Sequence, residues 1–234
     1  MHLTPEEEQL AHEADRYIKD HKDQLIERFA NPAMYHPDSH PSSYFMAGSP
    51  GAGKTEFSVR LIERLPDNTP VRIDADEIRA MLPGYTGGNA HIFQRACSTG
   101  VSKLFEHVLH QKLNAMLDGT FAHQRAMENI QRSLSRGRQV VIYYIFQDPI
   151  VAWQFTQARE EKEGRRILKD TFINGMLSAY NNVKMAKREF GSAIVLNLVI
   201  KNFRNEFEDA HGDISDIDSY LPKVYTQEEL EKLI

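Results

Sequence analysis

The fold of this chain is decided at residues 48–55, which read Gly48-Ser49-Pro50-Gly51-Ala52-Gly53-Lys54-Thr55. They match G-x-x-x-x-G-K-[ST], the pattern of loops that bind nucleoside triphosphates, at every fixed position. The apolar residues 44–47 come directly before them. A buried strand there would bring the loop to the carboxyl edge of a sheet, where the backbone N–H groups of residues 51–55 point at phosphate oxygens. The sequence therefore predicts a phosphate-binding loop between a strand and a helix.

Two side chains of this loop carry the expected chemistry. Lys54 would bridge the outer phosphates, and Thr55 would offer its hydroxyl to Mg²⁺. The dipole of the following helix favours the negative charge of the phosphates. The alternative is a chance glycine-rich turn. Apolar residues at helical spacing directly after the loop argue against it, namely Phe57, Leu61, Ile62 and Leu65.

Composition sets limits on the class of protein. With 234 residues, 41% of them hydrophobic and 26% charged, the chain is typical of a soluble globular protein. The net charge of −5 and the pI near 6.1 argue against nucleic-acid and membrane-surface binding. Its longest apolar runs, residues 140–146 and 193–200, are far shorter than the roughly 20 residues of a membrane span. A polar N-terminus and a single cysteine, Cys97, favour a cytoplasmic location without disulfides.

Strand and helix patterns alternate from residue 43 onward. Strands are expected at residues 43–47, 71–74, 114–118, 140–146 and 192–200. Helices are expected at residues 56–65, 76–81, 90–110, 123–136, 150–163 and 169–190. This alternation predicts an α/β fold, a P-loop kinase-like parallel sheet flanked by helices. Ligands of such sheets bind at the carboxyl ends of the strands.

The first 42 residues precede this pattern. Thr4-Pro5-Glu6-Glu7 is typical of a helix start, and apolar residues then recur at helical spacing to residue 29. We expect one long helix, or two in tandem, forming an N-terminal helical extension (residues 1–42) packed on the core. Residues 43–234 would then form the P-loop kinase domain, with a helical lid near residues 150–168.

Two aspartates follow the second expected strand. Asp74 and Asp76 lie at its exit, on the edge that carries the phosphate loop. Phosphoryl transfer requires a group that accepts the proton of the acceptor hydroxyl, and Asp76 is the candidate base. Arg79, one helical turn further, would keep that carboxylate ionised. The alternative is that Asp76 only caps the helix. Asp74 would support the metal or close a turn.

The third expected strand ends at Asp118-Gly119-Thr120. Asp118 resembles the second acid of a nucleotide site, which organises the water around Mg²⁺. The alternative is a turn aspartate before glycine. Thr120 lies one step further out, where its hydroxyl would contact the acceptor or a phosphate.

With these residues, the chain resembles the zeta-toxin family of P-loop kinases, relatives of chloramphenicol phosphotransferase and polynucleotide kinase. The resemblance spans about residues 44–166. Besides the phosphate loop, the motifs that carry it are Ile73-Asp74-Ala75-Asp76-Glu77-Ile78-Arg79, Leu82-Pro83-Gly84-Tyr85, Asp118-Gly119-Thr120, and Gly164-Arg165-Arg166-Ile167 after Arg159.

The resemblance implies both an activity and roles for residues. Family members are typically ATP-dependent kinases of UDP-N-acetylglucosamine that phosphorylate the 3′-hydroxyl of the amino sugar. Many are held inactive by a small helical antitoxin. The implied roles are base for Asp76, phosphate lysine for Lys54, substrate contact for Thr120 and Glu106, and γ-phosphate clamp for Arg159 and Arg165.

Two features leave alternatives open. The family often has Glu-Gly-Thr-Gly-Arg where this chain has residues 118–122, Asp-Gly-Thr-Phe-Ala, so an arginine expected near the sugar nucleotide is absent. Arg159 and Glu163 are also spaced to pair along a solvated helix, with no role in catalysis.

The sequence thus predicts a cytoplasmic, ATP- and Mg²⁺-dependent kinase that phosphorylates a hydroxyl of a small nucleotide-linked sugar, a zeta-type toxin. One alternative is a kinase of another small acceptor: a nucleoside, an antibiotic or a nucleic-acid end. The other is a regulatory ATPase without a small-molecule acceptor, which would tolerate loss of Asp76.

Overall fold

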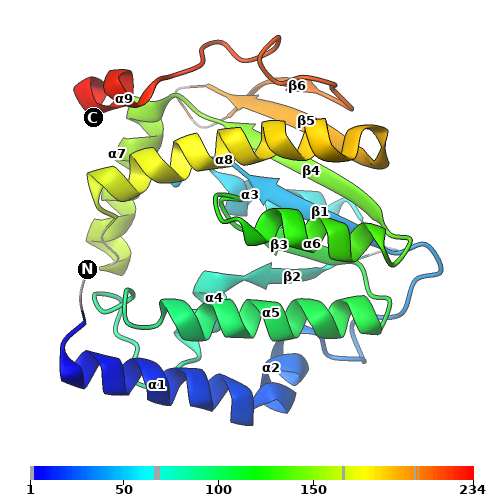
Figure 1. Cartoon of the computed structure of the whole chain (residues 1–234), viewed down its shortest axis with the longest axis vertical. Coiled ribbons are helices and arrows are strands. Elements are labelled where there is room, and N and C mark those ends of the chain that lie inside the picture. Colours follow the sequence, from blue (N-terminus) through cyan, green and yellow to red (C-terminus); the bar gives the residue numbers. More distant parts are fainter. Residues whose placement is uncertain (1–2, 66–68, 165–166, 203, 205) are drawn as a thin grey trace.

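A six-stranded sheet organises the molecule, in the order β2-β3-β1-β4-β5-β6 (Figure 1). The computed structural model describes residues 3–65, 69–164, 167–202, 204 and 206–234. β1 to β5 are parallel, and β6 is antiparallel to β5. The strands are β1 (Ser42–Ala47), β2 (Val71–Asp74), β3 (Ala115–Asp118), β4 (Gln139–Phe146), β5 (Ile194–Lys201) and β6 (Phe207–His211). The predicted α/β class and its five parallel strands are confirmed, and every predicted strand end lies within two residues of the observed one.

Helices cover both faces of this sheet. They are α1 (Pro5–Asp20), α2 (Lys22–Phe29), α3 (Lys54–Glu63), α4 (Ala75–Ala80), α5 (Gln94–His110), α6 (Arg125–Leu134), α7 (Pro149–Glu163), α8 (Lys169–Phe190) and α9 (Gln227–Leu233). In Figure 1, α5, α6 and α8 lie in front of the sheet and α3 lies behind it. Because strand side chains alternate between faces, Phe45 packs edge-on against Phe105 in front, whereas Met46 joins the cluster around Phe57 on the α3 side.

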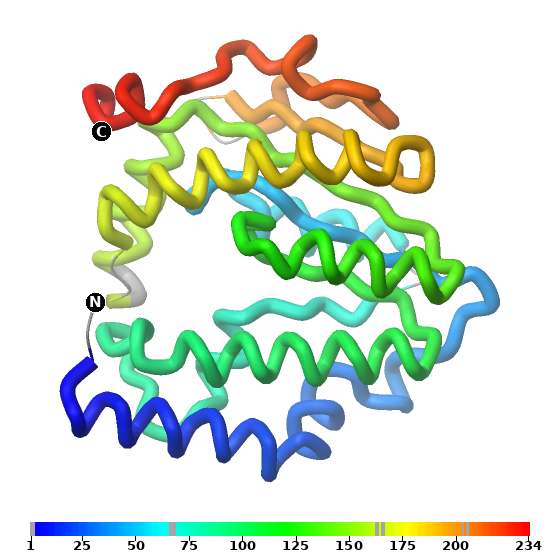
Figure 2. Tube along the Cα trace, in the orientation of Figure 1, coloured from blue at the N-terminus to red at the C-terminus, as the bar shows by residue number. Residues whose placement is uncertain are grey.

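The N-terminal segment forms two helices in tandem, separated at His21. α1 begins with the expected capping box, in which Thr4 and Glu7 exchange side-chain hydrogen bonds with each other's backbone. Its apolar face packs on α5 through the fully buried Ile18. Asp15, also buried, accepts hydrogen bonds from Thr99 Oγ1 at 2.6 Å and Lys19 Nζ at 2.7 Å. This segment therefore lies along α5 at one end of the molecule (Figure 2).

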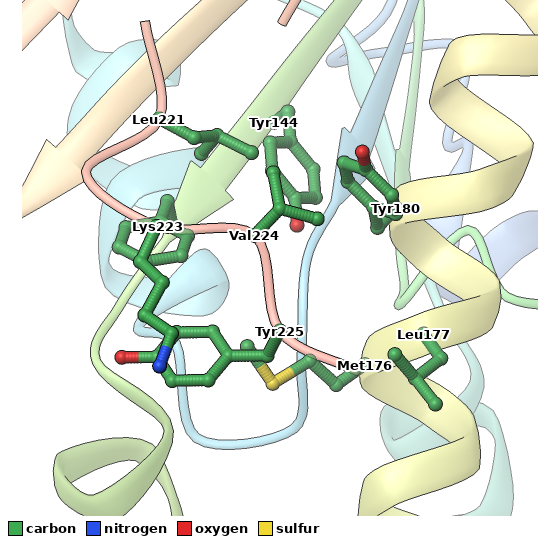
Figure 3. Close-up of a pocket in the computed structure, with 9 residues that line it drawn as sticks. Tyr144, Met176, Leu177, Tyr180, Leu221, Lys223, Val224 and Tyr225 are labelled. Atoms are coloured by element: carbon green, nitrogen blue, oxygen red, sulfur yellow. The ribbon is translucent and has the colours of Figure 1, made fainter. Parts of the chain in front are cut away.

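The C-terminal segment lies at the opposite end and adds β6 and α9, which the sequence analysis did not anticipate. Between them the chain crosses β4 and α8, where Leu221, Val224 and Tyr225 face Tyr144 and Met176 (Figure 3). The cavity left between these side chains is only about 20 Å³, room for about one water molecule. This segment closes the apolar core and leaves no room there for a substrate.

No helix in the part of the chain that the structure describes combines the length and apolar character needed to cross a membrane.

Candidate active site

The phosphate loop connects β1 to α3 in a conformation that requires glycine. Gly48 and Gly51 have φ angles of 140° and 74°. A Cβ on Gly48 would lie 2.3 Å from the carbonyl oxygen of Ile145, and one on Gly51 would lie 2.0 Å from that of Ala152. The loop is thus packed directly against the end of β4 and the first turn of α7. Side chains at these positions would displace it.

Lys54 and Thr55 open α3 directly after the loop. The Lys54 ammonium is buried beneath the loop and donates to the carbonyl oxygens of Gly48 at 3.1 Å and Ser49 at 2.6 Å. Burial lowers the pKa of Lys54 to about 8; the charge of Asp118 opposes this shift and that of Arg159 adds to it. The amine is therefore still mostly protonated at neutral pH and lies beneath the loop that is expected to hold the phosphates.

α7 lies along the edge of the sheet at which the parallel strands end (Figure 1). Asp148 caps its N-terminus by accepting from the backbone N–H of Ile150 at 2.9 Å. Further along, Arg159 is exposed yet close enough to affect the pKa of Lys54. α7 thus combines a contact with the phosphate loop and an arginine in the electrostatic range of Lys54. Arg165, the second arginine of the expected clamp, lies outside the described residues.

The two aspartates after β2 have different positions. Asp74 is the N-cap of α4, because its Oδ1 accepts from the backbone N–H of Asp76 at 2.8 Å. Asp76 itself lies in the first turn of α4. The capping role that was the alternative for Asp76 therefore belongs to Asp74. Arg79, which is buried, donates to Asp76 Oδ1, while the Asp76 side chain remains 38% exposed. This contact sets a buried positive charge against the carboxylate, which remains partly open to solvent.

Arg72 is a residue of this site that the sequence analysis missed. From β2 its Nε and Nη2 reach Asp118 Oδ2 at 2.9 and 2.8 Å, and Nη2 also reaches Asp74 Oδ2 at 2.6 Å. Its Nη1 donates to Glu77. The available signal was an arginine between two buried strand residues, directly before the acidic run. A charge at such a position requires partners.

Asp118 and Thr120 lie where β3 leaves the sheet. Asp74 and Asp118 are register partners on neighbouring strands, so the two carboxylates share one edge. Asp118 Oδ2 accepts from Ser58 Oγ at 2.7 Å as well as from Arg72. The Thr120 carbonyl accepts from the backbone N–H of Gly48 at 3.2 Å, which joins this turn to the phosphate loop.

Glu106 is the one described candidate that the structure does not bring to this edge. α5 starts next to the site, since Arg79 Nη2 donates to Gln94 Oε1 at 3.4 Å. Glu106 follows about 18 Å further along the helix axis. There it pairs with Arg132 and Arg136, and hydrogen bonding from Arg132 lowers the pKa of the Glu106 carboxyl. The structure therefore places Glu106 away from the Asp76–Arg79 pair, and the expected contact of Glu106 with substrate stays a prediction.

A loop of this sequence and conformation, between the third strand in spatial order and a helix, defines a P-loop nucleotide-binding α/β protein. The family model described as Zeta toxin matches residues 26–213, and the chain belongs to this family of P-loop kinases. No curated protein matches the chain at a significant level.

Similar solved structures share the fold. A chain from the PezAT chromosomal toxin–antitoxin system of the human pathogen Streptococcus pneumoniae has a TM-score of 0.63 at 18% identity, over 99% of this chain and 93% of that chain. The native AvrRxo1-ORF1:-ORF2 complex has a TM-score of 0.54 at 16% identity, over 88% of this chain and 66% of that chain. The same complex with ATP has a TM-score of 0.53 at 16% identity, with the same two shares.

Proposed function

We propose that the protein transfers the γ-phosphoryl group of ATP to a hydroxyl of a small acceptor, with Asp76 as the base. The observation that carries this proposal is the pairing of Asp76 with the buried Arg79, in a half-open position on the sheet edge that holds Lys54. Membership of a family of P-loop kinases and an ATP-bound structure of similar fold support ATP as the donor.

Each residue contributes one part of the transfer. Asp76 takes the proton from the hydroxyl group of the acceptor. The hydroxyl oxygen then attacks the γ-phosphorus of ATP, and the bond between the γ-phosphorus and the oxygen that bridges to the β-phosphate breaks, releasing ADP. Lys54 and Arg159 compensate the charge of the transferred group. Mg²⁺, when bound, would neutralise the phosphates; Thr55 and Asp118 are the residues that would hold it. They fit a hard cation, since both supply oxygens at the end of the loop and of β3.

The acceptor we infer is a nucleotide-linked sugar, UDP-N-acetylglucosamine. This choice depends on the family resemblance and on Thr120, whose turn adjoins the phosphate loop. Phe121 and Ala122 stand where many family members have glycine and arginine, and Phe121 has a φ of 63°. Other hydroxyl acceptors therefore belong in the same experiment.

We further propose that the protein acts as a toxin in the cytoplasm and has a small helical antitoxin as partner. Solved structures of similar fold come from a toxin–antitoxin system and from a two-component complex. In this proposal residues 1–42 form a supporting extension, residues 43–234 form the kinase domain, and residues 150–168 close over bound ATP as a lid.

The test is product formation from ATP with UDP-N-acetylglucosamine, a nucleoside or an aminoglycoside, followed by mass spectrometry. Asp76→Asn should lower kcat by about 10²- to 10⁴-fold, because the general base is lost. Asp20→Asn, at an exposed position of α1, is the matched control and should retain full activity. Full transfer by Asp76→Asn would rule out the base. ATP turnover that needs no acceptor and no Asp76 would favour the regulatory ATPase.

A further inference from the structure

One guanidinium, that of Arg72, joins the elements that carry the candidate site. Its hydrogen bonds reach Asp118 at the end of β3, Asp74 and Glu77 at the start of α4, and Ser58 Oγ of α3 at 3.3 Å. The Arg72 side chain is only 15% exposed. Burial alone would lower its pKa, but the surrounding carboxylates outweigh burial and raise it. Arg72 is therefore a fixed positive charge at the centre of three carboxylates.

Its contacts with α4 lie on both sides of the candidate base. Asp74 precedes Asp76 and holds its backbone N–H, and Glu77 follows Asp76 directly. Both side chains also form ion pairs with Arg72. The first turn of α4, and with it the backbone of Asp76, is thus attached to the Arg72 guanidinium at two points.

Its contacts on the other side lead to the phosphate loop. Ser58 belongs to α3, the helix that opens with Lys54 and Thr55. Ser58 Oγ donates to Asp118 Oδ2 at 2.7 Å, the same oxygen that accepts from Arg72. This connection runs from the phosphate-loop helix through Asp118 and Arg72 to α4 by direct hydrogen bonds between side chains.

We propose that Arg72 is a positioning residue that sets the place of Asp76 relative to the bound triphosphate. This inference rests on the proposed function, in which Asp76 is the base. A planar guanidinium donates in several fixed directions at once, and a lysine ammonium lacks that geometry. Arginine is accordingly the side chain that can hold α3, β3 and α4 together, and displacement of a reacting group by about 1 Å costs about 100-fold in rate.

The experiment is a double-mutant cycle between Arg72 and Asp76, measured as kcat and KM for ATP. Arg72→Met should lower kcat by about 10- to 100-fold with KM for ATP within about 3-fold. In the Asp76→Asn background the same change should have almost no further effect, because no base remains to be positioned. Arg72→Lys should restore only part of the rate. The control is Arg132→Met, which removes an arginine of α6 that is ion-paired with Glu106, and it should leave kcat unchanged.

Glu77→Gln keeps the experiment decisive if loss of Arg72 prevents folding. Glu77 is 46% exposed, so this change removes one attachment of α4 without opening the core. It should lower kcat several-fold, again only when Asp76 is present. An equal loss in both backgrounds, or a rise in KM for ATP with unchanged kcat, would overturn the positioning role. Full activity of Asp76→Asn alone would instead overturn the proposed function.

Discussion

Lys54 supplies a positive charge that is buried beneath the phosphate loop. Its ammonium is buried, and two carbonyl groups of the loop hold it in place. Burial disfavours the charged form, whereas a bound triphosphate would favour it strongly. The pKa of about 8 in the free protein is the result of burial, opposed by Asp118 and assisted by Arg159, with smaller contributions from Glu56 and Asp76.

A pH dependence of ATP binding follows from this value. Lys54 is protonated below a pH of about 8 and loses its charge above it. Because the neutral amine no longer attracts phosphate, the Kd for ATP should rise by up to about tenfold per pH unit above pH 8. Lys54→Arg retains its charge throughout this range and should show a flatter profile. Titration with a fluorescent ATP analogue between pH 7 and 9.5 measures both. A Kd for the unmodified protein that stays constant over this range would contradict the burial argument.

The elements differ in how much of them the sequence could predict. β4 is a continuous apolar run buried on both faces, and its pattern alone predicted it. β6 reads Phe-Glu-Asp-Ala-His, is largely exposed, and pairs only with the edge of β5. Such a strand lacks the burial pattern on which prediction depends. The capping box of α1 was predictable because its two members are three residues apart.

The residues of the candidate site also differ in how far the sequence could predict their positions. The phosphate loop, Asp76 and Asp118 were predictable, because a local pattern or the end of a strand placed them at one edge. Arg72 contacts Asp118, 46 positions away in the sequence, and this contact exists only once β2 and β3 are paired. Glu106 was expected near the substrate, but the length of α5 carries it to the far end of the helix.

The contact between α1 and α5 provides a test at the level of elements. Ile18 is fully buried in this contact, so Ile18→Ala should lower the free energy of unfolding by about 2–5 kcal/mol. Glu13→Ala, on the exposed face of the same helix, should change it by less than about 0.5 kcal/mol. Urea unfolding measures both. Similar stability of the two variants would contradict the stabilising role of the contact between α1 and α5.

At the level of the whole molecule, one arginine joins neighbouring strands at each edge of the sheet: Arg72, which is partly buried, and Arg138, which is buried. Arg72 lies at the carboxyl edge among carboxylates. Arg138 lies at the amino edge and donates to Ser43 Oγ at 2.8 Å and to the carbonyl oxygens of Ser42 at 2.7 Å and Leu113 at 2.5 Å. Burial lowers the pKa of Arg138 to about 10, whereas that of Arg72 is raised by its acidic partners. Asp38 acts on Arg138 through its charge, whereas Asp74, Glu77 and Asp118 accept hydrogen bonds from Arg72 at the edge that carries the phosphate loop.

The effect of the protein on bacterial growth tests the proposed toxin role. If the protein is a toxin that acts through phosphoryl transfer, its expression in a bacterial host without an antitoxin should arrest growth. Lys54→Ala should abolish the arrest, because the charge beneath the phosphates is lost while the loop glycines keep their conformation.

Lys22→Ala, at an exposed position of α2, should remain toxic and serves as the matched control. Growth curves, with immunoblots showing equal amounts of each protein, measure the effect. Arrest by folded Lys54→Ala would separate toxicity from phosphoryl transfer. Normal growth with the unmodified protein, at levels where it phosphorylates its acceptor in extracts, would exclude the toxin role and leave the kinase.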